Sequence, residues 1–172
     1  MTLEMRDVTK RVGAEIHIHE TSLTFLPGRF NVLLGETNAG KTTLMKLMAG
    51  LDHPTSGQVL INGVDVTKRS TQERQISFVH QFFVNYPHLS VYENIASPLR
   101  LAKLSSADID RRVRDAADLM KLTPMLTRRP QELSGGQQQR TALARAIVKE
   151  SRVVFLDEPL ANLDYKLREE LR

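Results

Sequence analysis

The clearest pattern along the chain is a set of short apolar runs bounded by polar residues. Runs of this kind predict buried strands. They span Arg29–Leu34, Ile76–Val79 and Val153–Leu156, and the last is entirely apolar, as is typical of a buried parallel strand. Gln58–Ile61 and Val64–Val66 flank an Asn-Gly pair. Because both residues of that pair tolerate positive φ, these two runs predict a hairpin with a tight turn.

Other stretches repeat their apolar residues with the period of a helix. Lys41–Ala49, Ala107–Leu122 and the segment after Leu133 therefore predict helices. Ser105 with Asp108, and Ser134 with Gln137, have the spacing of N-terminal capping boxes. The residues predicted to face the core from these helices are Leu44, Leu47, Met48, Ile109, Val113, Ala116, Met120, Ala142, Leu143, Ala146 and Ile147.

Strands that alternate with helices predict an α/β fold with a parallel sheet. Hairpins in the first third predict an antiparallel β portion at the N-terminus. The segment from about 82 to 133 is expected to be mostly helical and to form its own lobe. A length of 172 residues fits one domain, and 41% apolar with 26% charged residues is ordinary globular composition.

Composition argues against several classes of function. The net charge of +4 is spread along the chain without a basic block, so nucleic acid is not expected as a partner. The absence of cysteine excludes disulfides and thiolate metal sites. The N-terminus lacks the apolar region of a signal peptide, and no apolar stretch approaches bilayer length. A soluble protein is expected.

The segment from Gly35 to Thr42 has the spacing G-x-x-x-x-G-K-[ST] between a predicted strand and a predicted helix. This context predicts a P-loop, in which backbone N–H groups and the positive end of the helix bind phosphates. Lys41 would reach the β and γ phosphates, and the Thr42 hydroxyl would ligate Mg²⁺. Asn38 can adopt the left-handed conformation if the loop requires it.

A pair of acids, Asp157 and Glu158, follows the apolar run Val153–Leu156. Carboxylates at this position lie at the carboxyl edge of a parallel sheet, where α/β proteins bind their ligands. Asp157 would hold a metal directly or through water, and Glu158 would orient or deprotonate an attacking water. The alternative is an acidic N-cap for a following helix.

The stretch LSGGQQQR places Gly135 and Gly136 where a helix is predicted to begin. Each glycine costs a helix about 1 kcal/mol relative to alanine. Bare backbone at a helix N-terminus suits the close approach of an anion, such as a phosphate of a nucleotide held by another copy. The alternative is that Ser134 and Gln137 serve only as a capping box.

GETNAGKTT, LSGGQQQR and VFLDEPLANLD occur in the order and spacing of the Walker A, signature and Walker B/D-loop motifs. Over essentially its whole length the chain resembles ABC-type ATPases. The resemblance implies an ATP- and Mg²⁺-dependent P-loop ATPase in which two domains pair head to tail, with each ATP between one Walker A and the other signature. The implied ATP-binding residues are Gly35, Glu36, Thr37, Asn38, Ala39, Gly40, Lys41, Thr42 and Thr43, and in trans Ser134, Gly135, Gly136 and Gln137.

Other roles are implied residue by residue. Gln81 matches the Q-loop glutamine, which reaches the metal and the attacking water, so Glu158 and Gln81 are the implied catalytic residues. The implied metal ligands are Thr42, Gln81 and Asp157. The implied D-loop is Ala161, Asn162, Leu163 and Asp164.

Tyr86–Asn94 resembles the Q-loop continuation of ATPases that drive sugar and polyol importers. The C-terminal ANLDYKLREELR resembles the same subgroup, more specifically its glycerol or glycerol-phosphate branch. This implies a motor subunit that hydrolyses ATP to power import. Its implied partners are a second ATPase subunit and transmembrane permease subunits, and its implied location is the cytoplasmic face of the inner membrane, as a peripheral protein.

Two features depart from the family pattern, and a histidine pair has two possible roles. After Val8-Thr-Lys10 the chain has Arg11 and Val12 where the family offers an aromatic ring to adenine. The chain ends at Arg172, before the strand that carries the switch histidine, so the C-terminal part of the domain is expected to be missing. His17 and His19 share one face of a strand, which is either solvated or a metal pair.

Two alternative functions remain. One is a nucleotide-binding fragment without turnover. The other is an ABC-type ATPase of DNA repair, chromosome architecture or translation, although such proteins usually insert coiled coils or basic arms.

Overall fold

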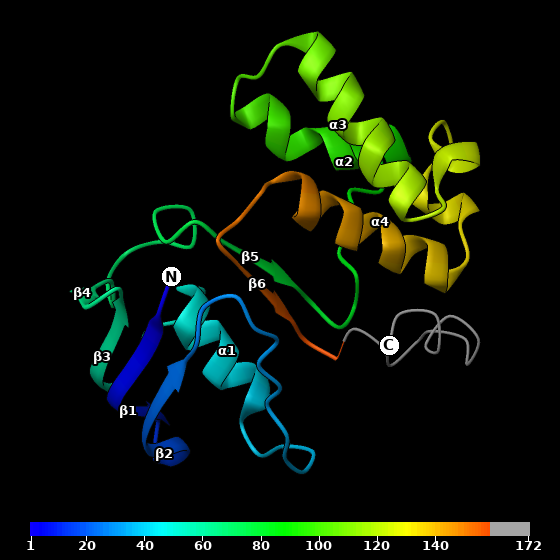
Figure 1. Ribbon diagram of the computed structural model, residues 1–172. Coiled ribbons are helices and arrows are strands. Elements are labelled where there is room, and N and C mark those ends of the chain that lie inside the picture. Colours follow the sequence, from blue (N-terminus) through cyan, green and yellow to red (C-terminus); the bar gives the residue numbers. More distant parts are fainter. Residues whose placement is uncertain (159–172) are drawn as a thin grey trace. The chain divides into compact units, whose positions relative to one another are not determined.

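The computed structural model describes residues 1–158 and divides into two units, Met1–Ile76 and the part from Ser77 onward (Figure 1). The first unit contains a four-stranded sheet, and the second contains a two-stranded sheet with most of the helices. Across residues 1–158 the helices are too short or too polar to form a bilayer-spanning segment.

The first unit is an antiparallel sheet with strand order β2-β1-β3-β4. Its strands are β1 (Leu3–Val12), β2 (Glu15–Phe25), β3 (Ser56–Ile61) and β4 (Val64–Asp65). Asn62 and Gly63 both have positive φ, 50° and 78°, in the turn between β3 and β4. The antiparallel N-terminal portion and its tight hairpin are therefore confirmed.

Helix α1 (Lys41–Ala49) packs its apolar face inward, with Leu44, Leu47 and Met48 buried as predicted. Its carboxyl end is closed by Arg74, which is 2% exposed and donates to Leu47 O at 2.8 Å and Met48 O at 2.7 Å. A cation at this end of a helix also interacts favourably with the helix dipole. Arg74 thus fixes α1 from the end opposite the glycine-rich loop.

The second unit pairs β5 (Ile76–Val79) with β6 (Val153–Leu156), and the two arrows point the same way, as a parallel pair requires (Figure 1). Its helices are α2 (Val91–Leu101), α3 (Ser106–Leu119) and α4 (Gly135–Val148), with 3-10 turns at Thr123–Met125 and Pro130–Glu132. Apolar side chains of α2, α3 and α4 form one core cluster. Helices thus occupy much of the segment that was predicted to be mostly helical.

The predicted strand Arg29–Leu34 is wrong, because the structure has no strand there. Its apolar side chains are exposed, at 101% for Phe30, 76% for Val32 and 85% for Leu34. Within residues 1–158 no strand pairs with this segment. An apolar run favours burial, but a strand also needs neighbours to satisfy its backbone N–H and C=O groups.

Two predictions of burial are also partly wrong. In β6 only Phe155 is buried, while Val154 and Leu156 remain 40% and 38% exposed. On α4, Ile147 is 40% exposed, whereas the polar Gln139 and Thr141 are fully buried. The helical period predicts which side of a helix faces the core. It does not predict which residues at the margins of that side are covered by neighbouring elements.

Candidate nucleotide-binding site

The loop before α1 has the backbone of a phosphate cradle. Asn38 adopts the left-handed conformation that an asparagine tolerates, with φ 66°, and Gly40 caps the helix with φ 84°. A Cβ at Gly40 would lie 2.7 Å from Ile18 Cδ1 and 3.1 Å from His17 O. Glycine is required here both by its conformation and by the close approach of β2.

Lys41 folds back over this loop. Its Nζ donates to Gly35 O at 2.9 Å and to Glu36 O at 2.6 Å. Glu36 itself is exposed, and its carbonyl also accepts from Ala39 N at 3.2 Å. The ammonium group is therefore held at the helix N-terminus, where an incoming phosphate would find both the charge and the helix dipole.

The predicted catalytic pair meets in the second unit. Gln81 Nε2 donates to Glu158 Oε2 at 2.9 Å. Asp157 is 4% exposed, and its backbone N donates to Val79 O at 3.0 Å. Because Gln81 follows β5 and the two acids follow β6, parallel neighbouring strands bring them to one edge of the sheet.

Glu158 is exposed and has a left-handed backbone, with φ 48°. Such a conformation costs an ordinary L-residue about 1–2 kcal/mol, and strain of this kind is often found at functional sites. The alternative role of these acids, as an N-cap for a following helix, falls on residues outside those described. The predicted D-loop, Ala161, Asn162, Leu163 and Asp164, also lies outside residues 1–158.

The start of α4 forms the predicted capping box. Ser134 N donates to Gln137 Oε1 at 2.9 Å, and Gln137 N donates to Ser134 Oγ at 3.3 Å. Ser134 and Gly135 are exposed, Gly136 is half-buried, and a Cβ at Gly135 would meet no atom within 4 Å. The box is complete, and the helix end remains open to an anion, so the two interpretations are compatible.

The family model described as "ABC transporter" matches residues 18–161. The chain belongs to the ABC transporter family. Gly35–Thr43, Leu133–Arg140 and Val153–Glu158, which resemble the Walker A, signature and Walker B motifs, all lie within the matched residues.

Several curated relatives are similar over almost the whole chain. The Fe(3+) ions import ATP-binding protein FbpC of Vibrio cholerae is 45% identical over 98% of this chain and 48% of its own length. The trehalose/maltose import ATP-binding protein MalK of Thermococcus litoralis is 45% identical over 96% of this chain and 46% of its own length. The spermidine/putrescine import ATP-binding protein PotA of Pseudomonas aeruginosa is 44% identical over 99% of this chain and 47% of its own length. The chain thus spans about half the length of these relatives, whose named solutes differ.

Among solved structures, the dimeric post-hydrolysis state of the ATP-binding cassette MJ0796 bound to ADP and Pi matches with a TM-score of 0.88 and 30% identity. The match covers 98% of this chain and 79% of that one. The predicted α/β fold of an ABC ATPase, with an antiparallel portion, a parallel sheet and helices, is confirmed.

The segment after Gln81 is hydrogen-bonded to α4 through residues that the motifs did not identify. Arg145 of α4 donates to Val84 O, and its guanidinium lies 4.9 Å from the Tyr86 ring centroid. Burial lowers the pKa of Arg145, and Tyr86 partly opposes this. Asn85 Nδ2 donates to Gln138 O at 2.9 Å. The sequence carried no signal for Arg145, because its partners lie about sixty positions away.

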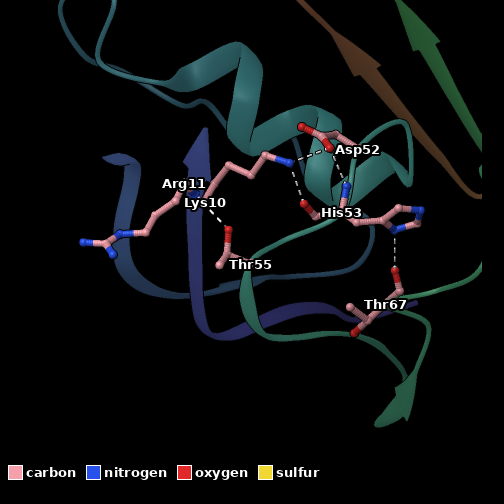
Figure 2. Close-up of polar contacts among 6 residues, drawn as sticks. All are labelled: Lys10, Arg11, Asp52, His53, Thr55 and Thr67. Atoms are coloured by element: carbon pink, nitrogen blue, oxygen red, sulfur yellow. Dashed lines mark hydrogen bonds and ion pairs between the residues drawn. The ribbon is translucent and has the colours of Figure 1, made fainter. Parts of the chain in front are cut away.

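Lys10 lies in a polar network that joins β1 to the loop after α1 (Figure 2). Its Nζ donates to Asp52 Oδ1 at 2.7 Å and to His53 O at 2.8 Å, and His53 Nδ1 lies 3.1 Å from Thr67 O. The hydrogen bond from Lys10 lowers the pKa of Asp52, with desolvation opposing. Arg11 donates only its backbone N to this network, at Thr55 Oγ1, and its side chain extends away from it.

His17 and His19 are both exposed on β2, and His17 Nε2 lies 3.6 Å from Glu15 Oε2. Within the part of the chain that the structure describes, no three metal-binding side chains gather. A solvated strand face, the first of the two alternatives, agrees with these observations.

Proposed function

We propose that this chain is the ATP-binding part of a membrane importer, which binds ATP with Mg²⁺ and hydrolyses it to power uptake of a solute. The hydrogen bond between Gln81 and Glu158, at 2.9 Å, is the observation that carries the catalytic part of this proposal. It joins the two residues implied to act on the attacking water, although 77 positions separate them in the chain. Relatives named as import ATP-binding proteins support the transport part.

ATP binding would begin at the Walker A loop. The phosphates would displace the carbonyls of Gly35 and Glu36 as partners of Lys41 Nζ, because a charged oxygen is the stronger acceptor. Backbone N–H groups of residues 35–43 and the N-terminus of α1 would bind the same phosphates. The residues Glu36, Thr37, Asn38, Ala39, Thr42 and Thr43 complete the proposed cradle.

The residues proposed for Mg²⁺ are Thr42, Gln81 and Asp157. They offer a hydroxyl, an amide and a carboxylate oxygen, which are the hard donors that Mg²⁺ prefers, so the chemistry of the set fits the ion. When bound, Mg²⁺ would neutralise charge on the phosphates. Asp157, 4% exposed at the end of β6, would be the charged ligand.

Glu158 would act as the general base. Gln81 Nε2 donates to Oε2 of its carboxylate and so orients the group, and the remaining lone pairs of the carboxylate would accept the water's proton. Ser134, Gly135, Gly136 and Gln137 of a second copy would bind the γ-phosphate across the dimer, with the open N-terminus of α4 as the donor group. The dimeric neighbour bound to ADP and Pi supports such an arrangement.

The partners proposed for the chain are a second ATPase subunit and transmembrane permease subunits, at the cytoplasmic face of the inner membrane. Phe82, Val84 and Tyr86, exposed at 85%, 59% and 44%, offer an apolar surface to such a permease. The finer proposal is a sugar or polyol solute, of the glycerol or glycerol-phosphate branch. The relatives MalK, named for trehalose/maltose, and UgpC of Bordetella avium, named for sn-glycerol-3-phosphate, support it.

The Glu158→Gln variant tests the catalytic proposal. It should bind MgATP as the unaltered chain does and lose hydrolysis, because an amide cannot accept the proton. Asp118→Asn, at an exposed position of α3, is the matched control and should change neither quantity. Unchanged hydrolysis by Glu158→Gln would remove Glu158 as the base.

A further inference from the structure

The loop that is expected to bind phosphates contains a carboxylate. Glu36 directly follows Gly35 and is the one acidic residue between Arg29 and Ala49. Among residues 1–158, those that line the cavity of about 270 Å³ beside the loop include Lys41 and no carboxylate. Glu36 therefore places a single negative charge where an anion is expected to bind.

The backbone of Glu36 contacts the group that would hold the phosphates. Lys41 Nζ donates to Glu36 O at 2.6 Å, and Ala39 N donates to the same oxygen at 3.2 Å. Bond lengths then place the Glu36 carboxylate within about 10 Å of Lys41 Nζ in every side-chain rotamer. Because the Debye length at 0.1 M ionic strength is also about 10 Å, salt screens this carboxylate from a bound phosphate only in part.

The charge of Glu36 is not neutralised by a neighbouring side chain. Glu36 is exposed, and within residues 1–158 its carboxylate has no hydrogen-bond or ion-pair partner. Lys41 donates to the carbonyl oxygens of Gly35 and Glu36 and not to a carboxylate. The carboxylate of Glu36 therefore repels any anion that the loop binds.

We propose that Glu36 is a specificity-determining residue, whose carboxylate selects the Mg²⁺ complex of a nucleoside triphosphate over the free, more highly charged anion. This inference rests on the proposed function, because it requires the phosphates to occupy the Walker A loop. Coulomb repulsion is proportional to the charge of the ligand, and Mg²⁺ cancels about half of the charge of ATP. Glu36 therefore weakens the binding of free ATP more than that of MgATP.

The test measures the affinity of the full chain for MgATP and, with a chelator present, for free ATP, by titration calorimetry at low ionic strength. Coulomb's law in water at about 10 Å corresponds to about a twofold loss of affinity per unit of ligand charge. In Glu36→Gln the affinity for free ATP should therefore rise about 15-fold and that for MgATP about fourfold. In about 1 M salt, where the Debye length is about 3 Å, both gains should disappear.

Two control variants separate charge from structure. Glu36→Asp keeps the charge and should bind both ligands as the unaltered chain does. Asp118→Asn removes the same charge from an exposed position of α3 and should leave both affinities unchanged.

An equal change of both affinities in Glu36→Gln would overturn the inference, because the substitution would then act through the conformation of the loop. Unchanged affinities would also overturn it, as would a loss of affinity in Glu36→Gln that Glu36→Asp does not show. Failure of the proposed function looks different: the unaltered chain would then bind neither free ATP nor MgATP.

Discussion

Two helix N-termini in this protein are suited to phosphates, and they are built in opposite ways. Helix α1 begins at Gly40, which is left-handed, has no side-chain cap and lies against Ile18. Helix α4 begins after Ser134, whose capping box with Gln137 is complete and whose neighbour Gly135 faces open space. The N-terminus of α1 depends on close packing against β2 and on Lys41, whose Nζ donates to carbonyl oxygens of the preceding loop. The second is complete within four residues and is open to a ligand from outside.

The largest expected effect concerns the lysine, which only the first helix end has. Lys41→Ala should weaken MgATP binding about 100-fold or more, because truncating one member of a desolvated charge pair costs roughly 2–5 kcal/mol. Titration calorimetry would measure this, with Lys68→Ala, at an exposed position of the same unit, as the control. A loss below about fivefold would mean that the loop binds phosphate without Lys41.

The same substitution should have opposite effects on stability at the two helix ends. Gly40→Ala should lower the free energy of unfolding by about 2 kcal/mol, because alanine at φ 84° is strained and its Cβ would approach Ile18 Cδ1 to 2.7 Å. Urea denaturation would measure the change. A neutral result would show that β2 moves away from the loop easily.

Gly135→Ala should instead stabilise the protein, by about 0.5–1 kcal/mol. Its Cβ would meet nothing within 4 Å, and alanine loses less backbone entropy in a helix than glycine. If the same denaturation experiment showed destabilisation at Gly135, the contrast between the two helix ends would be lost.

The smallest expected effect concerns the polar network of Lys10, Asp52 and His53, which joins β1 to the loop after α1. The folded-state pKa of Asp52 lies below its ordinary value of 3.8, chiefly through the hydrogen bond from Lys10. Folding therefore favours the charged carboxylate of Asp52. Its contribution to the free energy of unfolding is fully present above pH 3.8 and is lost as the pH falls through the lower pKa that Asp52 has in the folded state. Asp52→Asn should cost about 0.5–1 kcal/mol at pH 7, since the pair is partly exposed. This difference should disappear at low pH in thermal unfolding, whereas a difference independent of pH would contradict it.

The features that the sequence predicted well depend on neighbouring residues. The capping box of Ser134 and Gln137, the Asn62-Gly63 turn and the face of α1 are each set within a few positions of the chain. The meeting of Gln81 and Glu158 was implied by the family resemblance, and the order of their two strands accounts for it.

The features that the sequence did not predict depend on distant partners. Arg29–Leu34 has the composition of a strand, but pairing is decided by other strands and not by its own residues. Arg74 and Arg145 look like surface charges in the sequence, yet both are held by carbonyl oxygens of distant segments. A pattern of charged residues carries no information on which backbone carbonyls a long side chain will reach.

The central claim is that the two helix ends of different copies share one ATP. Mixing two variants tests it most directly: Lys41→Ala, which should disable the Walker A loop, and Gly135→Asp, which places a carboxylate where the γ-phosphate would bind. Each variant alone should hydrolyse no ATP, while a mixture should recover part of the unaltered rate, because mixed dimers contain one site with both halves intact. A mixture as inactive as its components, under conditions where the unaltered chain is active, would contradict the shared site.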